Sequence, residues 1–203
     1  AMRIAMPRIG FIVVLILAVF LVTLPVSAAQ KKTLLEPANT VEFGRLGKVT
    51  LYRPAGRPTE LVLFLSGDGG WSLGVIQMAQ HLAEQGALVA GIDIIGYKDR
   101  LLDSSQGCLY PAGDLETFAH FLENRFRFPK YVNPILAGYS SGATMAYATL
   151  AQAPAGTFKG ALSLGFCPDL PWPKPMCKGS GAGLKNEPGK KERFVYEPLP
   201  GLK

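Results

Sequence analysis

Residues 41–166 alternate between strand-like and helix-like patterns of apolar and polar positions. Residues 41–53 alternate around a turn near Gly47, which is typical of a β-hairpin. Continuous apolar runs predict strands covered on both faces at 61–65, 87–92, 132–137 and 160–166. Helical spacing predicts helices at 72–85, with Ser72 as the cap, at 114–126 and at 143–152, and residues 94–111 are expected to form a long loop.

This order of elements predicts an α/β fold. Strands that alternate with helices give a mostly parallel sheet with helices on both faces, and the hairpin adds antiparallel strands to it. The pattern changes after Phe166, because residues 168–203 hold seven prolines, six lysines and a single short strand candidate at 193–196. We therefore expect the sheet to stop growing there and the fold to be C-terminally incomplete.

Residues 1–28 have the layout of a secretory signal peptide. Two arginines precede an uncharged run at 9–24, and small residues follow it. Cleavage after Ala28 or Ala29 leaves a domain of residues 29–203. The alternative is an uncleaved membrane anchor, although the run is slightly shorter than the ~20 residues that cross a bilayer. Both interpretations expose the domain to an extracytoplasmic compartment.

Composition and charge exclude some classes of protein. The 203 residues are 48% apolar, which suffices for one core and argues against a disordered chain. The formal charge is +6, and about +4 without the leader, because the leader carries two of the positive charges and no negative one. The chain has no basic block of five or more residues, so direct nucleic-acid binding is not supported. Attraction to an anionic membrane surface stays open.

The chain has three cysteines, Cys108, Cys167 and Cys177. Thiols tend to pair in an oxidising compartment, so an odd number leaves one over. Cys167 and Cys177 flank a proline-rich loop that a disulfide between them would restrict. The alternative is unpaired buried thiols. None of the three has the spacing of a zinc site, and no metal or cofactor is expected.

The segment 138–142, GYSSG, matches the G-x-S-x-G pattern between a predicted strand and a predicted helix. In that context the pattern is typical of a nucleophile elbow, in which small residues let the backbone turn sharply around the serine. The helix that follows directs its unpaired amides and the positive end of its dipole at developing negative charge. Ser140 is the predicted nucleophile, and the amide of Ser141 is a predicted oxyanion donor.

A glycine-rich loop, Ser66–Gly70, follows an earlier predicted strand, where the second oxyanion donor is expected. Glycine allows backbone conformations in which amides point inward. The amide of Asp68 is the predicted donor, with Gly69 as the alternative. For either motif, the competing interpretation is a plain strand-to-helix turn.

The sequence has no recognisable catalytic base. An elbow serine works with an acid and a histidine that follow it in the chain, but His81 and His120 both precede Ser140 within predicted helices, on solvated or packed faces. Asp169 is a candidate acid, and a turn residue is the alternative interpretation. The sequence therefore predicts either a fragment or a protein that has lost its activity.

Three further residues lie near the expected site. Asp93 ends a predicted strand, and we expect it to be structural or to line the cleft. Trp71 and Tyr139 flank the expected pocket, where substrate contact and core packing are the alternatives.

Four segments resemble the bacterial virulence protein family VirJ/AcvB, over about residues 41–203: LFLSGDGGW (63–71), GIDIIGY (91–97), GYSSGATMAYATLAQAP (138–154) and SLGFCPDLPWPKPMCKGSG (163–181). The resemblance implies an α/β-hydrolase fold, export to the periplasm and a serine hydrolase site. The family nucleophile falls on Ser140 and its oxyanion loop on Ser66–Trp71. The family's late aspartate and histidine have no match here.

The resemblance also implies a substrate and partners. Members are associated with virulence and type IV secretion, and one branch hydrolyses lysyl-phosphatidylglycerol at the outer face of the inner membrane. We therefore expect a periplasmic serine hydrolase of aminoacyl-phospholipids, with secretion components or cargo as candidate partners. The alternatives are a non-catalytic binding or chaperone module on the same fold, and an unrelated secreted esterase or lipase.

Overall fold

The computed structural model describes residues 39–181, 184, 187–188 and 194–199. All of them belong to the second of the two units into which the chain divides, Thr33–Lys203, which is described here by itself. The expected signal peptide, residues 1–28, lies outside the described residues. Among the residues that are described, no helix is both long and apolar enough to cross a membrane.

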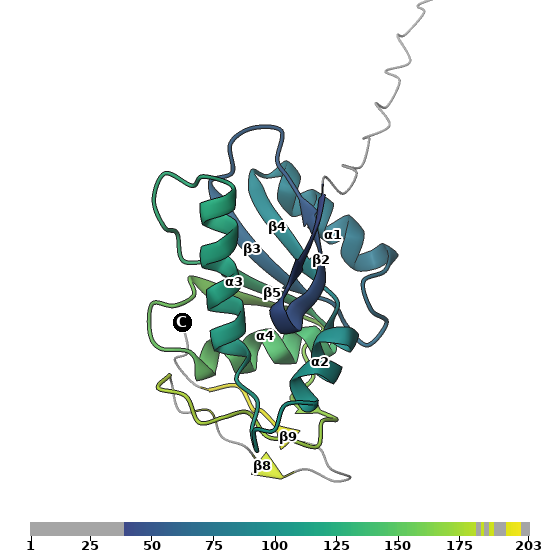
Figure 1. The fold of residues 1–203 in the computed structure, drawn as a ribbon. Helices are drawn as coiled ribbons and strands as arrows, with labels where there is room; N and C mark the ends of the chain where they lie inside the picture. Colours follow the sequence, from purple (N-terminus) through teal and green to yellow (C-terminus); the bar gives the residue numbers. More distant parts are fainter. Residues whose placement is uncertain (1–38, 182–183, 185–186, 189–193, 200–203) are drawn as a thin grey trace, which may run out of the picture. The chain divides into compact units, whose positions relative to one another are not determined.

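A six-stranded sheet forms the centre of this unit (Figure 1), and its strands follow the order β1-β2-β4-β3-β5-β6. The last four strands in this order are mutually parallel, whereas β2 pairs antiparallel with both of its neighbours, β1 and β4. This arrangement confirms the predicted mostly parallel sheet with an antiparallel hairpin at one end. The strands are β1 (Asn39–Phe43), β2 (Gly47–Tyr52), β3 (Glu60–Leu65), β4 (Ala87–Ile92), β5 (Ile135–Tyr139) and β6 (Gly160–Leu164).

Helices cover both faces of the sheet, which confirms the predicted layers. In β3, Leu61, Leu63 and Leu65 pack with α2, α3 and α4, whereas Val62 and Phe64 pack with α1 on the opposite face. This alternation explains why β3 reads as a continuous apolar run, since each face of the strand has its own helical layer. The helices are α1 (Leu73–Glu84), α2 (Ile94–Leu102), α3 (Pro111–Arg125) and α4 (Ser141–Gln152).

The structure corrects one predicted element and shifts the bounds of several others. Residues 94–111 do not form one long loop, because α2 occupies their first half. The helix α3 begins at Pro111, since a proline fits the first position of a helix. The strand β5 begins at Ile135 rather than at residue 132, because Pro134 has no N–H group for the sheet. The helix α4 begins at Ser141, immediately after the turn.

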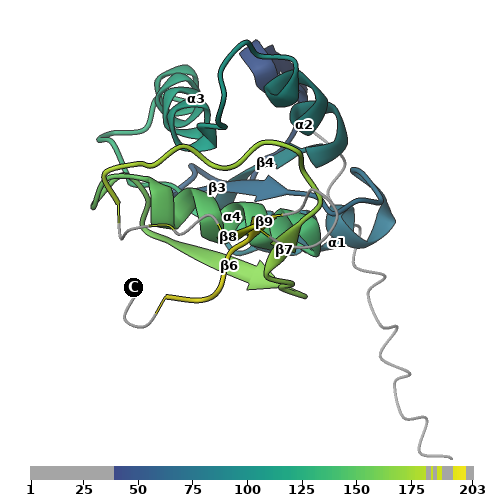
Figure 2. The same ribbon diagram turned by 90° about the horizontal axis from the view of Figure 1, so that it is seen from below.

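The segment after β6 crosses α4, as Figure 2 shows in yellow-green. It forms a small antiparallel sheet of β7 (Asp169–Leu170), β9 (Phe194–Val195) and β8 (Glu187–Pro188). The expected short strand at 193–196 is thus confirmed in β9. Side chains of α4 bind this segment, because Thr144 donates a hydrogen bond to the carbonyl of Cys167 and Gln152 donates one to the carbonyl of Cys177.

The disulfide joins Cys108 to Cys177, so the expectation that Cys167 pairs with Cys177 was wrong. The reason lies in the backbone, because the amide of Leu109 donates to Pro175 (2.8 Å) and the amide of Cys177 donates to Leu109 (2.7 Å). These hydrogen bonds hold the two Cα atoms of the disulfide 4.8 Å apart. Cys167 is exposed and takes no part in this disulfide.

Within the described sheet, β6 is the last strand on its side, and its apolar side chains are only partly covered. Leu162 is 48% exposed and Leu164 is 44% exposed. Both line an apolar cavity of about 420 Å³ together with Phe64, Met78 and Leu82. The α1 face of the sheet is therefore open beside β5 and β6.

Candidate active site

Ser140 occupies a strained turn between β5 and α4. Its φ is 55° and its ψ is −124°, a combination that non-glycine residues rarely adopt. Hydrogen bonds fix the turn on both sides, since the Ser140 amide donates to the Leu164 carbonyl of β6 (2.9 Å) and the Ser140 carbonyl accepts from the Ala143 amide of α4 (2.8 Å). The structure thus contains the elbow that the G-x-S-x-G pattern predicts.

Both glycines of the pattern are required by close packing. A Cβ atom on Gly138 would lie 2.0 Å from the carbonyl oxygen of Gly142, and a Cβ on Gly142 would lie 2.1 Å from the carbonyl oxygen of Ser66. Neither contact is with a flexible side chain that can move away. The two glycines therefore allow the strand, the turn and the helix to meet at Ser140.

The N-terminus of α4 lies directly after Ser140. Ser141 is the first residue of this twelve-residue helix, so its amide has no acceptor within the helix. The aligned peptide dipoles of α4 place partial positive charge at this end. An anion that forms beside Ser140 is therefore near an unpaired amide and a favourable field.

The glycine-rich loop 66–70 meets the elbow from β3. A Cβ on Gly67 would lie 3.0 Å from the Cβ of Ser140, so the two backbone turns are in close contact. The Gly70 amide donates to the Gly67 carbonyl (2.9 Å), and Gly70 has a φ of 70° that suits glycine. The loop is thereby folded back on itself beside the serine.

One cavity brings the loop and the elbow together. Its volume is about 150 Å³. The residues that line it are Gly67, Asp68, Gly69, Gly70, Ser72, Gly74, Val75, Tyr139 and Ser140. Ser140, Asp68 and Gly69 thus border the same small space, and Ser141 follows Ser140 directly.

The buried hydroxyl of Ser66 connects the loop to α2, which sequence reasoning missed. Its Oγ accepts a hydrogen bond from the Ile94 amide (3.0 Å) and donates a longer one to the Gly67 carbonyl (3.3 Å). The sequence feature that could have indicated this role is a serine directly after a predicted buried strand.

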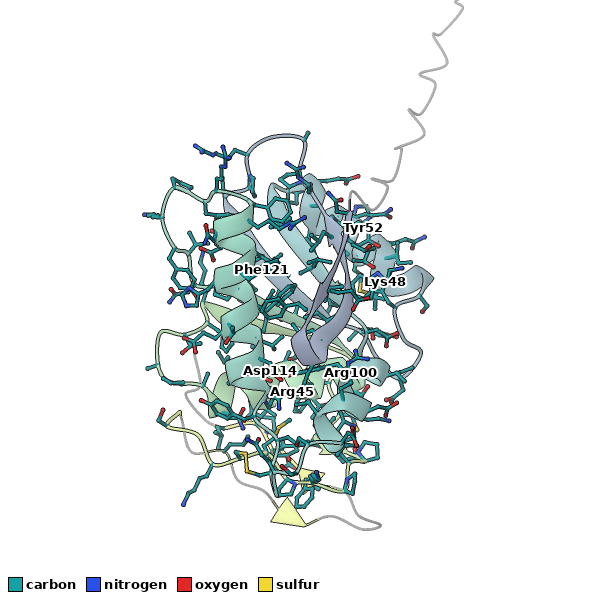
Figure 3. All side chains as sticks on the ribbon, viewed as in Figure 1. Arg45, Lys48, Tyr52, Arg100, Asp114 and Phe121 are labelled. Carbon is teal, nitrogen blue, oxygen red and sulfur yellow. A yellow bond between two sulfur atoms is a disulfide. The ribbon has the colours of Figure 1, made fainter. Side chains whose placement is uncertain are left out.

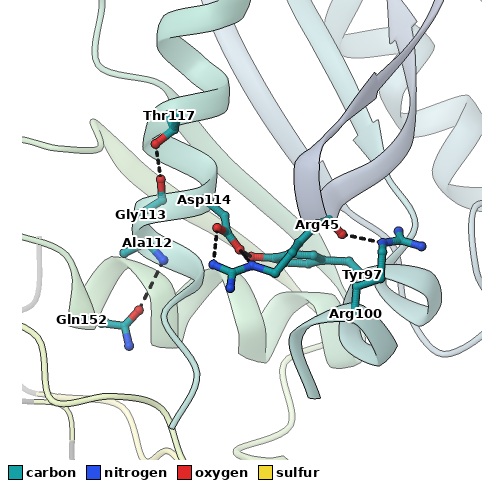
Figure 4. A network of polar contacts seen from close by, with 8 residues as sticks. All are labelled: Arg45, Tyr97, Arg100, Ala112, Gly113, Asp114, Thr117 and Gln152. Carbon is teal, nitrogen blue, oxygen red and sulfur yellow. Dashed lines mark hydrogen bonds and ion pairs between the residues drawn. The ribbon is translucent and has the colours of Figure 1, made fainter. Parts of the chain in front are cut away.

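A polar network holds α2 against α3 and the tip of the β1–β2 hairpin (Figures 3 and 4). Asp114 accepts hydrogen bonds from the Arg45 guanidinium, at 3.0 and 2.6 Å, and from the Tyr97 hydroxyl, at 3.0 Å. Arg100 donates to the carbonyls of Arg45 and Leu46. Burial, followed by the nearby Asp114 carboxylate, raises the pKa of Tyr97, and the hydrogen bond to Asp114 raises the pKa of Arg45.

The three residues that were expected near the site have different roles. Asp93 caps α2, since its Oδ1 accepts from the Ile95 amide (2.9 Å). Trp71 packs against the backbone of Gly91 and donates to the Tyr52 hydroxyl (3.2 Å), so it belongs to the core of the α1 face. Tyr139 is 44% exposed and lines the cavity beside Ser140.

Neither histidine of the chain lines the Ser140 cavity. His81 is exposed on α1, 3.2 Å from Glu84, and His120 is exposed on α3 and stacks on Tyr131. Of the two expected settings, a solvated or a packed helix face, both histidines take the solvated one. Asp169 lies in β7, where its Oδ1 accepts from the Cys167 thiol (2.7 Å), and it does not line the cavity. The cavity therefore unites the nucleophile and the oxyanion candidates, but it contains no imidazole.

No group of three or more potential metal ligands occurs among the described residues.

Three solved structures are similar to part of this chain at low identity, and the chain spans less than half of the length of each. The carboxyl esterase of Bacillus coagulans, in complex with glycerol, is 20% identical, with a TM-score of 0.47 over 61% of this chain and 42% of its own. A lipase in its open form is 18% identical, with a TM-score of 0.37 over 56% and 38%. Esterase B of Lactobacillus rhamnosis, inhibited by a tributyrin phosphonate, is 20% identical, with a TM-score of 0.39 over 59% and 42%.

The family assignment rests on the amino-acid sequence and not on these structural similarities. No curated protein matches the chain. Residues 59–163, more than half of the 203, match the family model of the bacterial virulence protein VirJ. This range includes the glycine-rich loop, the elbow, the parallel strands β3 to β5 and most of β6. The chain therefore belongs to the VirJ family of bacterial virulence proteins.

Proposed function

We propose that this chain is a carboxylic ester hydrolase of the serine-nucleophile type, with Ser140 as the nucleophile. One observation carries the proposal: Ser140 has a φ of 55° at an elbow that borders one cavity with the glycine-rich loop. Such strain persists only where the surrounding structure enforces it, and it is concentrated at functional sites. A plain strand-to-helix turn does not require a strained backbone at this residue.

The proposed reaction is acyl transfer. As Ser140 Oγ attacks the ester carbonyl, its proton leaves to a base, and the carbonyl oxygen becomes an anion. The amide of Ser141 and the amide of Asp68, or of Gly69, donate hydrogen bonds to this oxygen. Collapse of the intermediate breaks the ester C–O bond and releases the alcohol, and water then cleaves the acyl-serine.

The base is the missing component of this mechanism. His81 and His120 lie on other surfaces, so a base must reach Ser140 from solvent or from residues outside this cavity. Asp169 stays the candidate acid that would orient such a base. An elbow and oxyanion donors without a base retain only a small part of the catalytic power of a complete triad. We therefore expect slow turnover by this chain.

The lack of a histidine at Ser140 specifically favours a second candidate function. This function is a non-catalytic binding module that uses the same cavity to hold a secreted partner or cargo. A slow serine hydrolase and a binding module differ in whether the Ser140 oxygen forms covalent bonds.

We further propose that the substrate is an aminoacyl-phospholipid such as lysyl-phosphatidylglycerol, and that the protein acts in the periplasm in connection with type IV secretion. The family match to a bacterial virulence protein supports this setting, and the leader pattern supports export. The Asp68 carboxylate is exposed at the mouth of the Ser140 cavity, where it would attract a cationic aminoacyl group. The positive charge of the chain favours contact with an anionic membrane surface.

A fluorophosphonate probe tests the nucleophile directly. We expect mass spectrometry to find the label on the Ser140 peptide, and we expect Ser140→Ala to remain unlabelled. Ser72→Ala is the matched control, because Ser72 lines the same cavity and its side chain makes no capping hydrogen bond. Wild-type protein that stays unlabelled, or is labelled elsewhere, would favour the binding module.

Added imidazole tests the missing base. We expect imidazole to accelerate p-nitrophenyl acetate cleavage by the wild-type chain beyond the background reaction, and we expect no such gain with Ser140→Ala. The same assay with lysyl-phosphatidylglycerol vesicles tests the substrate. Faster cleavage of the simple ester than of the lipid would contradict the aminoacyl-lipid assignment but leave the nucleophile intact.

A further inference from the structure

The Ser140 cavity and the apolar cavity beside β6 lie one after the other between α1 and the sheet. On α1, Val75 lines the first cavity, and Leu82, which lies two turns later on the same side of the helix, lines the second. On β5, Tyr139 lines the first cavity and Ala137 lines the second, and residues two apart in a strand share a face. The apolar cavity therefore extends from the neighbourhood of Ser140 along the α1 face of the sheet.

Tyr139 lies where the two cavities meet. Its register partner in β6 is Leu164, which lines the apolar cavity. A Cβ atom on Gly67 would lie 3.5 Å from Cδ1 of the Tyr139 ring, and a Cβ atom on Gly165 would lie 3.8 Å from Cε2. Since Cδ1 and Cε2 are on opposite edges of the ring, the ring extends from the glycine-rich loop to the residue that follows β6. It therefore lies between Ser140 and the apolar cavity.

The Ser140 cavity also has a polar side. Asp68 and Ser72 line it and are exposed, and most of its other lining residues are glycines. Its volume of about 150 Å³ is well below the ~300 Å³ at which ligand pockets usually begin. The cavity can hold the carbonyl end of an ester, but a longer acyl chain must continue either past Tyr139 or past Asp68.

These two routes suit different acyl chains. A fatty acyl chain gains from burial, by about fourfold in binding for each methylene, so the apolar cavity favours it. A chain that ends in an ammonium group would lose hydration there, whereas the exposed Asp68 carboxylate attracts it. The residue that controls access to the apolar cavity thus decides which kind of chain Ser140 accepts.

We propose that Tyr139 is a specificity-determining residue, whose ring closes the apolar cavity to the acyl group on Ser140 and thereby favours cationic aminoacyl esters over fatty acyl esters. This role rests on the serine hydrolase function proposed above. Its consequence is largest for an aminoacyl-phospholipid, because that molecule contains both kinds of ester. Hydrolysis of the aminoacyl ester releases the amino acid and leaves the phospholipid intact, whereas hydrolysis of a fatty acyl ester degrades the lipid.

Two esters of equal chain length test this role. In p-nitrophenyl heptanoate the acyl chain ends in a methyl group, and in p-nitrophenyl 6-aminohexanoate it ends in an ammonium group. The readout is the ratio of their kcat/KM values with added imidazole, after subtraction of the rates with Ser140→Ala. We expect the wild type to favour the ammonium ester, and we expect Tyr139→Ala to shift the ratio toward the heptanoate by about tenfold or more. A merely structural role would change both rates alike.

Matched variants identify the groups that are responsible. Tyr139→Phe keeps the ring, so it should keep the wild-type ratio. Tyr139→Ala combined with Leu162→Lys places a charge in the apolar cavity at a half-exposed position, so the gain with the heptanoate should disappear. Asp68→Asn keeps the backbone amide but removes the carboxylate charge, so the rate should fall with the ammonium ester alone.

Four outcomes would overturn the role of Tyr139. They are a wild type that cleaves the heptanoate as fast as the ammonium ester or faster, an unchanged ratio in Tyr139→Ala, an equal shift in Tyr139→Phe, and a gain that persists with Leu162→Lys. Because Tyr139 is 44% exposed, its truncation should leave the fold intact, which circular dichroism checks. Should Tyr139→Ala fail to fold, Tyr139→Leu takes its place, with a smaller shift expected in the same direction.

The fluorophosphonate test separates this role from the proposed hydrolase function. Labelling of Ser140 together with an unchanged ester ratio overturns only the role of Tyr139. Wild-type protein that is not labelled and cleaves neither ester overturns the hydrolase function, and the specificity role falls with it.

Discussion

At the scale of single residues, the geometry of the candidate site depends on glycines, because a larger residue at these positions would collide with the neighbouring backbone. Gly138 and Gly142 lack the Cβ atoms that would collide with neighbouring carbonyl oxygens, and Gly67 lacks one that would press on Ser140. These absences let three backbone segments approach closely enough to hold Ser140 at a positive φ. The strain at the serine is thus maintained by close packing of the backbone around it.

We predict that Gly142→Ala destabilises the chain and abolishes labelling of Ser140 by a fluorophosphonate. The added methyl would lie 2.1 Å from the Ser66 carbonyl, so the loop or the helix must move. Overpacking of this kind typically costs about 1–3 kcal/mol in free energy of unfolding. Urea denaturation measures that cost. Gly160→Ala is the control, because a Cβ there meets nothing within 4 Å, and equal stability losses would refute the argument.

The nucleophile could be predicted from sequence because its geometry is set by residues two positions away. The pattern at 138–142 contains both glycines that permit the turn, and Ser66–Gly70 contains the flexible residues of the loop. The supporting role of the Ser66 hydroxyl was not predictable, because its partner Ile94 is 28 residues away. Contacts of that kind depend on the folded sheet, and no local pattern encodes them.

At the scale of elements, α2 is the helix that sequence reasoning missed. Asp93 caps it, and Ile94, Tyr97 and Leu101 are buried at helical spacing. The local pattern is weak, since Gly96 and the charged residues 98–100 interrupt the apolar positions. Tertiary contacts outweigh this weak local preference, since Tyr97 and Arg100 bind α3 and the hairpin tip. Because the amide of Ile94 holds Ser66, the position of α2 bears directly on the oxyanion loop.

We predict that the polar network at Tyr97 makes the free energy of unfolding of the chain fall at alkaline pH. The pKa of Tyr97 is raised in the folded state, so above pH 10 the unfolded chain loses this proton before the folded chain does. The stabilisation is complete below the unfolded pKa of about 10 and declines as the pH rises through the folded value. Tyr97→Phe should therefore lose less stability than the wild type between pH 9 and pH 11, as measured by urea unfolding. Equal losses of unfolding free energy in Tyr97→Phe and the wild type over this pH range would contradict the prediction.

At the scale of the whole described unit, the segment after β6 is attached by one covalent link and several polar contacts. The disulfide connects the chain before α3 with residues 69 positions later, and Lys174 donates to the carbonyls of Leu102 and Ser104. Which cysteines pair could not be predicted, because the pairing depends on how residues 108–109 and 175–177 align in the fold. The segment is thereby held over α4 and the end of α2.

We predict that reduction of the disulfide lowers the stability of the chain by about 2–4 kcal/mol, because the bond closes a long loop in the unfolded state. Urea unfolding with and without reductant measures the difference. Cys108→Ser combined with Cys177→Ser should match the reduced wild type, and Cys167→Ser should match the oxidised wild type. A loss of stability confined to Cys167→Ser would show that the wrong pair had been assigned.

Among the described residues, no strand pairs with the outer edge of β6, and this edge has few of the features that normally protect an open edge. An unpaired strand edge offers backbone hydrogen-bonding groups, and natural proteins usually protect such edges with charged residues, proline or a bulge. Residues 160–164 are GALSL and contain none of these charges or prolines. Their exposed leucines also border an apolar cavity. Exposed apolar surface beside an open edge promotes association with other chains.

We predict that this chain associates with itself at high concentration and that Leu162→Lys weakens the association. A lysine at this half-exposed position places charge on the edge strand and removes apolar surface, while the free energy of unfolding should change by no more than about 0.5 kcal/mol. Sedimentation velocity over a range of concentrations measures the association. Ile95→Lys is the matched control, because Ile95 is an exposed apolar residue of similar size on α2. If both variants weaken association equally, the added positive charge is responsible and not its place on the β6 edge. If neither variant weakens it, the chains do not associate through this edge.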